Sequence, residues 1–200
     1  MNLWRAAPLV LASKSKVRRT LLEAAGIPVG VDPADIDERA AEAPHAGALP
    51  EKIALLLARE KALAVARRRP GSLVLGADQT LALGNRRFSK PATISVAREQ
   101  LAALSSKTHA LHAGVAVARD GKILFETVTT AHLTMRALSN DALDAYLSAA
   151  GERILLNVGA YQLEGLGVHL FEKIEGDHFT ILGLPLLPLL AFFRREGILP

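Results

Sequence analysis

The first strand and helix of this chain are encoded in one stretch, Leu9-Val-Leu-Ala-Ser-Lys-Ser-Lys-Val-Arg-Arg-Thr-Leu-Leu22. Its first four residues are apolar without alternation and turn-type residues follow at once, which is typical of a buried strand. Apolar residues then recur at helical spacing, and Gly26 suits the left-handed backbone that often ends a helix. The stretch therefore predicts a strand and then a helix whose N-terminus is capped by Ser13 or Ser15.

Four cations lie at the beginning of this helix, namely Lys14, Lys16, Arg18 and Arg19. At the positive end of the helix dipole each of them is unfavourable by about a few tenths of a kcal/mol or more. The arrangement becomes favourable if an anion binds there, held by free backbone N–H groups, serine hydroxyls and arginine side chains. We therefore predict a phosphate-binding site, and the alternative is a solvated helix end in a basic protein.

The composition is that of a globular protein. The chain has 200 residues, of which 50% are hydrophobic and 22% charged, and it contains no cysteine. This excludes disulfides and thiolate metal sites and fits a cytoplasmic protein. A net charge of +4 with only 4% aromatic residues gives little support for nucleic-acid binding. The apolar stretch 181–193 is too short to span a bilayer, so we expect no membrane partner.

Strand and helix patterns alternate along the chain, which predicts an α/β fold with a mixed sheet and flanking helices in a single domain over residues 1–200. We expect a hairpin of residues 109–117 and 123–135 around Arg119-Asp120-Gly121. The other expected elements are strands at 29–37, 73–76 and 168–171, helices at 50–69, 95–105 and 139–151, a loop at 40–49 and a C-terminal helix ending at Gly197.

Asp78 directly follows the predicted strand 73–76, so its carboxylate is expected at the carboxyl end of that strand, where ligands bind in open α/β sheets. There it could bind a divalent cation or accept a proton from water, or it could simply begin a turn. Lys61 and Lys90 could pair with phosphate oxygens or be surface lysines, and Glu38 could be a metal ligand or a solvated acid.

The histidines His109 and His112 do not predict a metal site. They are three residues apart on a predicted strand, which sends their side chains to opposite faces.

Together these segments resemble the Maf family, and the resemblance covers nearly the whole chain. The matching motifs, in the family's order, are Ser13–Leu22 of the opening stretch, Leu57-Ala-Arg-Glu-Lys-Ala62, Gly76-Ala-Asp-Gln79, Lys90-Pro91, Glu164-Gly-Leu-Gly167, Glu172-Lys-Ile-Glu-Gly176 and Gly183-Leu-Pro-Leu186.

The resemblance implies a Maf/ITPase-like fold with two lobes around a cleft, a possible homodimer, and a nucleoside triphosphate pyrophosphatase that clears non-standard nucleotides. Such enzymes use a divalent metal, Mg²⁺ or Mn²⁺, to hydrolyse the bond between the α- and β-phosphates. Asp78 matches the family's catalytic aspartate. The expected substrate-binding residues are Ser13, Ser15, Arg18, Arg19, Glu38, Lys61 and Lys90. The alternative function is a catalytically weak nucleotide-binding regulator of septum formation and cell division.

Three further positions, Val17, Gln79 and Glu164, match sites that help to select the base in this family. Gln79 and Glu164 are similar to the branch that acts on 7-methyl-GTP. A carboxylate at Glu164 suits a guanine edge, because the N1–H and N2–H₂ groups of guanine are donors. That branch has Trp where this chain has Val17, and an aromatic face would favour a cationic, methylated base.

Overall fold

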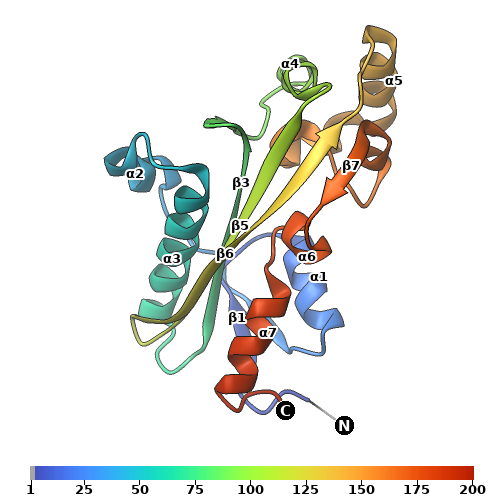
Figure 1. Ribbon diagram of the computed structural model, residues 1–200. Coiled ribbons are helices and arrows are strands. Elements are labelled where there is room, and N and C mark those ends of the chain that lie inside the picture. The colour runs from blue at the N-terminus through green and yellow to red at the C-terminus, as the bar shows by residue number, and fades with distance from the viewer. Residues whose placement is uncertain (1–2) are drawn as a thin grey trace. The chain divides into compact units, whose positions relative to one another are not determined.

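The computed structural model describes residues 3–200 and contains one mixed seven-stranded sheet with helices (Figure 1). The strands are β1 (Leu9–Leu11), β2 (Val29–Val31), β3 (Val74–Leu83), β4 (Arg86–Phe88), β5 (Thr108–Arg119), β6 (Lys122–Met135) and β7 (Phe171–Glu175). The α-helices are α1 (Lys16–Ala24), α2 (Glu38–Glu42), α3 (Pro50–Arg68), α4 (Ile94–Leu104), α5 (Asn140–Ala150), α6 (His178–Ile181) and α7 (Leu186–Arg195). Short 3₁₀ helices are η1 (Ala43–His45), η2 (Gly151–Leu156), η3 (Val158–Ala160) and η4 (Leu166–Leu170).

The strand order in the sheet is β2-β1-β3-β5-β6-β7, with β4 paired to β3. Strand β1 runs parallel to both β2 and β3, whereas β4 is antiparallel to β3 and β7 is antiparallel to β6. The predicted mixed sheet is therefore confirmed. The connection between β5 and β6 is also as expected, since Asp120 and Gly121 both have positive φ angles (50° and 74°), which suit a two-residue hairpin turn.

The chain divides into two compact units, in agreement with the expected two lobes. The first unit comprises the N-terminal part of the chain up to Gln79 together with His112–Thr129 and His178–Pro200. The second unit comprises Thr80–Leu111 and Thr130–Asp177.

In the first unit, helices cover both faces of the strands: α3 lies on one side, and α1 and α7 lie on the other (Figure 1). Leu75 and Ala77 of β3 belong to the apolar cluster formed with α1 and α7, whereas Val74 belongs to the cluster formed with α3. A Cβ atom at Gly76 would collide with the backbone carbonyl of Ala58 in α3, so glycine is required for this close contact. Because side chains alternate along a strand, Asp78 and Gln79, which follow Ala77 in β3, also point to opposite faces.

Several expected helix ends are confirmed. Ser15 is the N-cap of α1, its side chain accepting a hydrogen bond from the backbone N–H of Arg18 (3.3 Å). Gly26 has a φ of 74°, as predicted for the residue that ends this helix. Ser139 caps α5 in the same way, through the backbone N–H of Ala142.

Other expectations were wrong. Asp78 does not follow a strand, because β3 continues through it to Leu83 and is held there by pairing with β4. The strand expected at 29–37 ends at Val31. The loop expected at 40–49 overlaps the helix α2. This helix begins at Glu38 because the Asp37 side chain accepts a hydrogen bond from the backbone N–H of Ala40 (3.0 Å).

The strand expected at 168–171 was also misplaced. Residues Leu166–Leu170 form the 3₁₀ helix η4, and the strand β7 begins only at Phe171, where pairing with β6 starts. Within the part of the chain that the structure describes, no helix is long and apolar enough to cross a membrane.

Candidate active site

Three charged side chains meet in the first unit. The Nζ atom of Lys61 lies 2.6 Å from Oδ1 of Asp78 and 2.7 Å from Oε1 of Glu38. Lys61 comes from α3, Asp78 from β3 and Glu38 from the first residue of α2. The side chains of Lys61 and Asp78 are only 12% and 13% exposed, whereas Glu38 is 51% exposed. The sequence motifs thus converge on one group of two carboxylates around a lysine.

The surroundings of Asp78 make its carboxylate unusually basic. Burial raises the pKa of Asp78, and the positive charges of Lys61 and Arg18 oppose this effect without cancelling it. The nearby negative charge of Glu38 raises the Asp78 pKa further. A carboxyl group with a raised pKa is a better proton acceptor than an ordinary aspartate, which is what a general base requires.

Arg18 lies close enough to Asp78 and Glu38 for their charges to act on it, and its side chain joins three segments of the first unit. Its Nε donates a hydrogen bond to the carbonyl of Gly183 (2.8 Å), and its Nη1 donates to the carbonyl of Ala77 (2.9 Å) and to the hydroxyl of Ser13 (3.1 Å). Burial lowers the pKa of Arg18, while Asp78 and Glu38 act in the opposite direction. Arginine remains charged at any ordinary pH, so a positive charge is fixed beside the carboxylates.

Gln79 lies on the opposite face of β3 from Asp78. Its side-chain Nε2 donates hydrogen bonds to two backbone carbonyls at the end of α6, those of Thr180 and Ile181, both at 3.0 Å. Both amide protons of Gln79 are therefore used within the protein. Gln79 holds the segment that ends in Gly183, and Arg18 binds the carbonyl of Gly183 in the same segment.

The remaining residues of the predicted phosphate site show different surroundings. Arg19 pairs with Glu23 one helical turn later, with Nε and Oε1 2.7 Å apart and both side chains about half exposed. Val17 is half-buried, and the Ser13 hydroxyl accepts a bond from the backbone N–H of Ser15 (3.3 Å). Exposed ion pairs such as that of Arg19 contribute little and exchange readily.

Two further predicted residues, Lys90 and Glu164, belong to the second unit, and both are exposed. Lys90 lies two residues after the end of β4. Glu164 lies in a tight turn in which the backbone N–H of Gly165 bonds to the carbonyl of Gln162 (3.2 Å).

Sequence reasoning missed the backbone carbonyls that bind Arg18 and Gln79, and it assigned no role to Gly183 within its motif. Gly183 has a φ of 84°, and an added Cβ would lie 3.3 Å from the Arg18 guanidinium. The glycine in the sequence Gly183-Leu-Pro-Leu186 was the only available signal.

Among residues 3–200, no group of three or more His, Asp or Glu side chains is arranged to hold a metal ion. A divalent cation would therefore find at most the two carboxylates of Asp78 and Glu38. This donor set fits Mg²⁺, which is commonly bound through one or two carboxylates together with phosphate oxygens of the substrate and water.

Comparison with known proteins agrees with these motifs. The family description "Maf-like protein" matches residues 8–196. The chain belongs to the Maf family. It is 58% identical over 200 residues to a nucleoside triphosphate pyrophosphatase of Bradyrhizobium diazoefficiens, covering 100% of this chain and 99% of that protein.

Other Maf relatives carry related names. A nucleoside triphosphate pyrophosphatase of Rhodopseudomonas palustris strain HaA2 is 54% identical over 200 residues, covering 100% of this chain and 99% of that protein. A 7-methyl-GTP pyrophosphatase of Brucella suis biovar 1 is 54% identical over 190 residues, covering 94% and 96% of the two chains. Among solved structures, a HAM1 protein from Coxiella burnetii is 18% identical with a TM-score of 0.44, covering 65% of this Maf chain and 73% of that chain.

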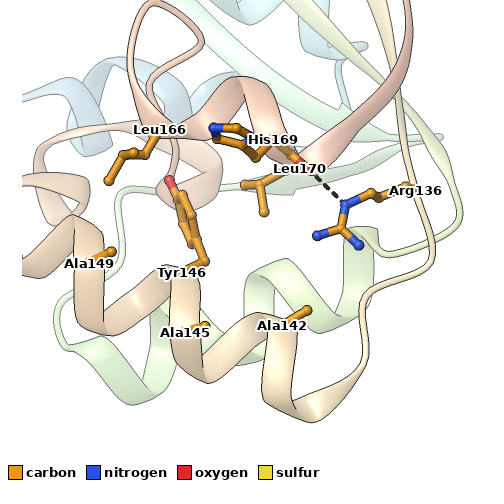
Figure 2. Close-up of a pocket in the computed structure, with 8 residues that line it drawn as sticks. All are labelled: Arg136, Ala142, Ala145, Tyr146, Ala149, Leu166, His169 and Leu170. Carbon is orange, nitrogen blue, oxygen red and sulfur yellow. Dashed lines mark hydrogen bonds between the residues drawn. The ribbon is translucent and has the colours of Figure 1, made fainter.

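A hollow in this Maf chain lies away from the charged group. A depression of about 310 Å³ in the second unit is lined by residues of α5 and η4 with Arg136 at one end (Figure 2). None of the predicted site residues lines it. Arg136 donates from Nε to the carbonyl of His169 (2.8 Å), which fixes η4 beside the end of β6.

Proposed function

We propose that this Maf chain is a nucleoside triphosphate pyrophosphatase that hydrolyses the bond between the α- and β-phosphates of non-standard nucleotides, releasing a nucleoside monophosphate and pyrophosphate. The observation that carries the proposal is the contact of the buried Lys61 with Asp78 and Glu38, beside the positive charge of Arg18. The names of the relatives agree with this enzyme class.

Asp78 acts as the general base in this proposal. Its raised pKa favours acceptance of a proton from the attacking water, while the ion pair with Lys61 fixes the orientation of the carboxylate. Water oxygen bonds to phosphorus, the proton passes to Asp78, and the bridging bond breaks with its electron pair remaining on pyrophosphate. Charge that develops on the leaving group is stabilised by the fixed cations Arg18 and Lys61.

A divalent cation, Mg²⁺ or Mn²⁺, is part of the proposal. Glu38 would hold it together with phosphate oxygens, which leaves Asp78 available to accept the proton, and such an ion would supply Lewis-acid stabilisation of phosphate charge. Each carboxylate has one oxygen bound to Lys61. The lysine therefore holds the two carboxylates close together before any substrate arrives.

The proposed substrate base is a modified purine such as that of 7-methyl-GTP. Glu164 is exposed and negatively charged, so it is suited to accept hydrogen bonds from the N1–H and N2–H₂ groups of guanine. Gln79 uses both amide protons on Thr180 and Ile181, which supports a role in shaping the binding site in place of direct contact with the base. At Val17 the chain offers an aliphatic surface, which favours less strict selection of a methylated base.

Product analysis tests the proposal. The protein is incubated with a panel of nucleoside triphosphates, including GTP, 7-methyl-GTP, UTP and dTTP, with Mg²⁺ or Mn²⁺. We expect pyrophosphate and a monophosphate as the products and faster turnover of guanine nucleotides than of pyrimidine ones. Release of inorganic phosphate and a diphosphate, or no turnover of any nucleotide, would contradict it. Turnover across this panel also separates an enzyme from a catalytically weak regulator of septum formation and cell division.

We also propose that two copies of the chain form a homodimer. Light scattering of the purified protein tests this directly. A molar mass of one chain at micromolar concentration would contradict it.

A further inference from the structure

The turn that carries Glu164 is held from within the second unit by a pair of tyrosines. The hydroxyl of Tyr161 shares a hydrogen bond of 2.7 Å with Nε2 of His109. The hydroxyl of Tyr146 donates a bond of 3.1 Å to the carbonyl of Ala160, the residue immediately before Tyr161. Two adjacent residues are thus bound by side chains from β5 and α5, just before the turn begins.

The backbone at this point needs such support. Ala160 has a φ of 58°, a left-handed conformation that is unfavourable for a residue with a Cβ atom and persists only where the surroundings enforce it. The preceding Gly159 also has a positive φ of 76°, and an added Cβ would lie 2.5 Å from the side chain of Leu81. The path of the chain into Tyr161 is therefore fixed by these contacts and by the glycine.

His109 provides a rigid partner for Tyr161. It is 1% exposed on β5, and its ring and that of Tyr161 both contact Phe171. Burial lowers the pKa of His109 to about 4, so the imidazole is neutral in the cell and its bond to Tyr161 does not change with moderate changes in pH. Its Nδ1 has no hydrogen-bond partner among the residues described. The polar contact of the His109 ring is therefore the bond between its Nε2 and the Tyr161 hydroxyl.

Glu164 follows Tyr161 closely along the chain. The turn begins one residue after Tyr161, at Gln162, whose carbonyl accepts the backbone N–H of Gly165. A Cβ at Gly167 would collide with the same carbonyl, so the turn is tightly folded back on itself. Glu164 lies inside this turn, after Gln162 and directly before Gly165. Its backbone therefore has little freedom once Tyr161 is fixed.

Figure 2 shows that Tyr146 rises from α5 toward the segment that bears Leu166, and Tyr146 and Leu166 line the same depression. Tyr146 is 8% exposed and Tyr161 is 6% exposed. Both hydroxyls are therefore bound inside the unit and are not available to a substrate, which distinguishes them from Glu164.

We propose that His109, through Tyr161, and Tyr146, through Ala160, are positioning residues that set the place of Glu164 and thereby the selection of the base. The inference rests on the proposed function, in which Glu164 contacts the base. These three buried side chains then influence which nucleotide binds without touching the substrate.

The test measures binding of the α,β-methylene analogues of GTP and UTP, which keep the triphosphate but are not cleaved at this bond. Tyr161→Phe removes one hydroxyl and keeps the ring. We expect it to weaken binding of the guanine analogue about three- to tenfold, as for the loss of one hydrogen bond, and to leave the uracil analogue within about twofold. Tyr146→Phe should act in the same direction. Equal weakening of both analogues would overturn the proposal, because a general loss of structure does not distinguish bases.

A double-mutant cycle with Glu164→Gln identifies the path of the effect. If Tyr161 acts through Glu164, Tyr161→Phe has no further effect on the ratio of guanine to uracil binding in the Glu164→Gln background. An additive effect would overturn the positioning role. If Glu164→Gln shifts the ratio and Tyr161→Phe does not, base reading stands and the positioning role falls. If neither changes it, base reading by Glu164 fails as well.

A matched control lies next to His109 on the same strand. Thr108 shares a hydrogen bond of 2.9 Å with Thr134, and it is exposed. Thr108→Val removes a hydroxyl from β5 without touching the turn, so its guanine-to-uracil ratio should equal that of the wild type. A shift in this control as large as that of Tyr161→Phe would overturn the assignment. Thermal melting of each variant shows that the proteins compared are folded.

Discussion

The two units of this Maf chain present their charged residues in different ways. In the first unit the largely buried Lys61 and Asp78 contact each other, and Arg18 is bonded to backbone carbonyls, so their positions are fixed before a nucleotide binds. In the second unit the side chains of Lys90 and Glu164 are exposed, and the fixed feature is the backbone turn that carries Glu164. The proposed function gives these groups different roles: the buried residues of the first unit act on the phosphates, and the exposed Glu164 of the second unit contacts the base.

Removing the buried lysine is expected to disturb the first unit most. Lys61→Met leaves Asp78 and Glu38 without the cation between them, and we expect kcat to fall about 10²- to 10³-fold for every nucleotide. Because Lys61 lowers the pKa of Asp78, its loss raises that pKa further. A base must be deprotonated to act, so the acid limb of the pH–rate profile should move to higher pH.

Lys52 offers a matched control for this variant, because it is an exposed lysine on the same helix α3. Lys52→Met should retain the wild-type rate and pH profile. An acid limb that stays in place in Lys61→Met would show that Asp78 is not the group that titrates in the reaction.

Replacing the buried arginine should have a smaller effect. Arg18→Lys keeps the charge but loses the planar group that binds the carbonyls of Ala77 and Gly183. We expect kcat/KM to fall about ten- to a hundredfold and the melting temperature to fall by several degrees, since hydrogen bonds from charged donors are each worth about 1.5–3 kcal/mol. Wild-type stability and activity together would show that these bonds are dispensable.

A change in the second unit should affect selection and spare the chemistry. Glu164→Gln replaces one acceptor oxygen by a donor, so the ratio of kcat/KM for GTP over UTP should fall about tenfold, with UTP turnover nearly unchanged. Glu172→Gln, an exposed carboxylate of β7 in the same unit, serves as the control. An unchanged ratio would mean that Glu164 does not read the base.

The smallest effect is expected for the exposed arginine of α1. Arg19 pairs with Glu23 in solvent, and such pairs contribute about 0–1 kcal/mol. Arg19→Ala should therefore change kcat/KM less than about threefold and hardly change stability. A loss as large as that of Arg18→Lys would place Arg19 among the phosphate contacts that its motif predicts.

Much of the fold and of the charged group in the first unit could be predicted from the sequence. Ser15 and Gly26 marked the ends of α1 because caps have strong local preferences, and the motifs around Lys61 and Asp78 were found in the order that the family shares. The extent of β3 could not be predicted in this way. Asp78 and Gln79 look like turn residues in the sequence, but β3 runs through them to Leu83 as an interior strand of the sheet, and its last residues pair with β4.

The second gap concerns contacts with the backbone. Arg18 and Gln79 bind carbonyls of Ala77, Thr180, Ile181 and Gly183, and a carbonyl carries no signal of its own in a sequence. The bond between His109 and Tyr161 likewise joins residues 52 positions apart, so only the folded chain brings them together. Such long-range polar contacts could not be predicted from this sequence.

The most direct test of the division between the units is the rate of pyrophosphate release by Asp78→Asn from both GTP and UTP, measured with saturating Mg²⁺. Asparagine keeps the shape of the side chain but cannot accept the proton, so we predict that kcat falls about 10²- to 10⁴-fold for both nucleotides while the ratio of their kcat/KM values stays that of the wild type. Activity within about threefold of the wild type, or a loss confined to one nucleotide, would contradict the account.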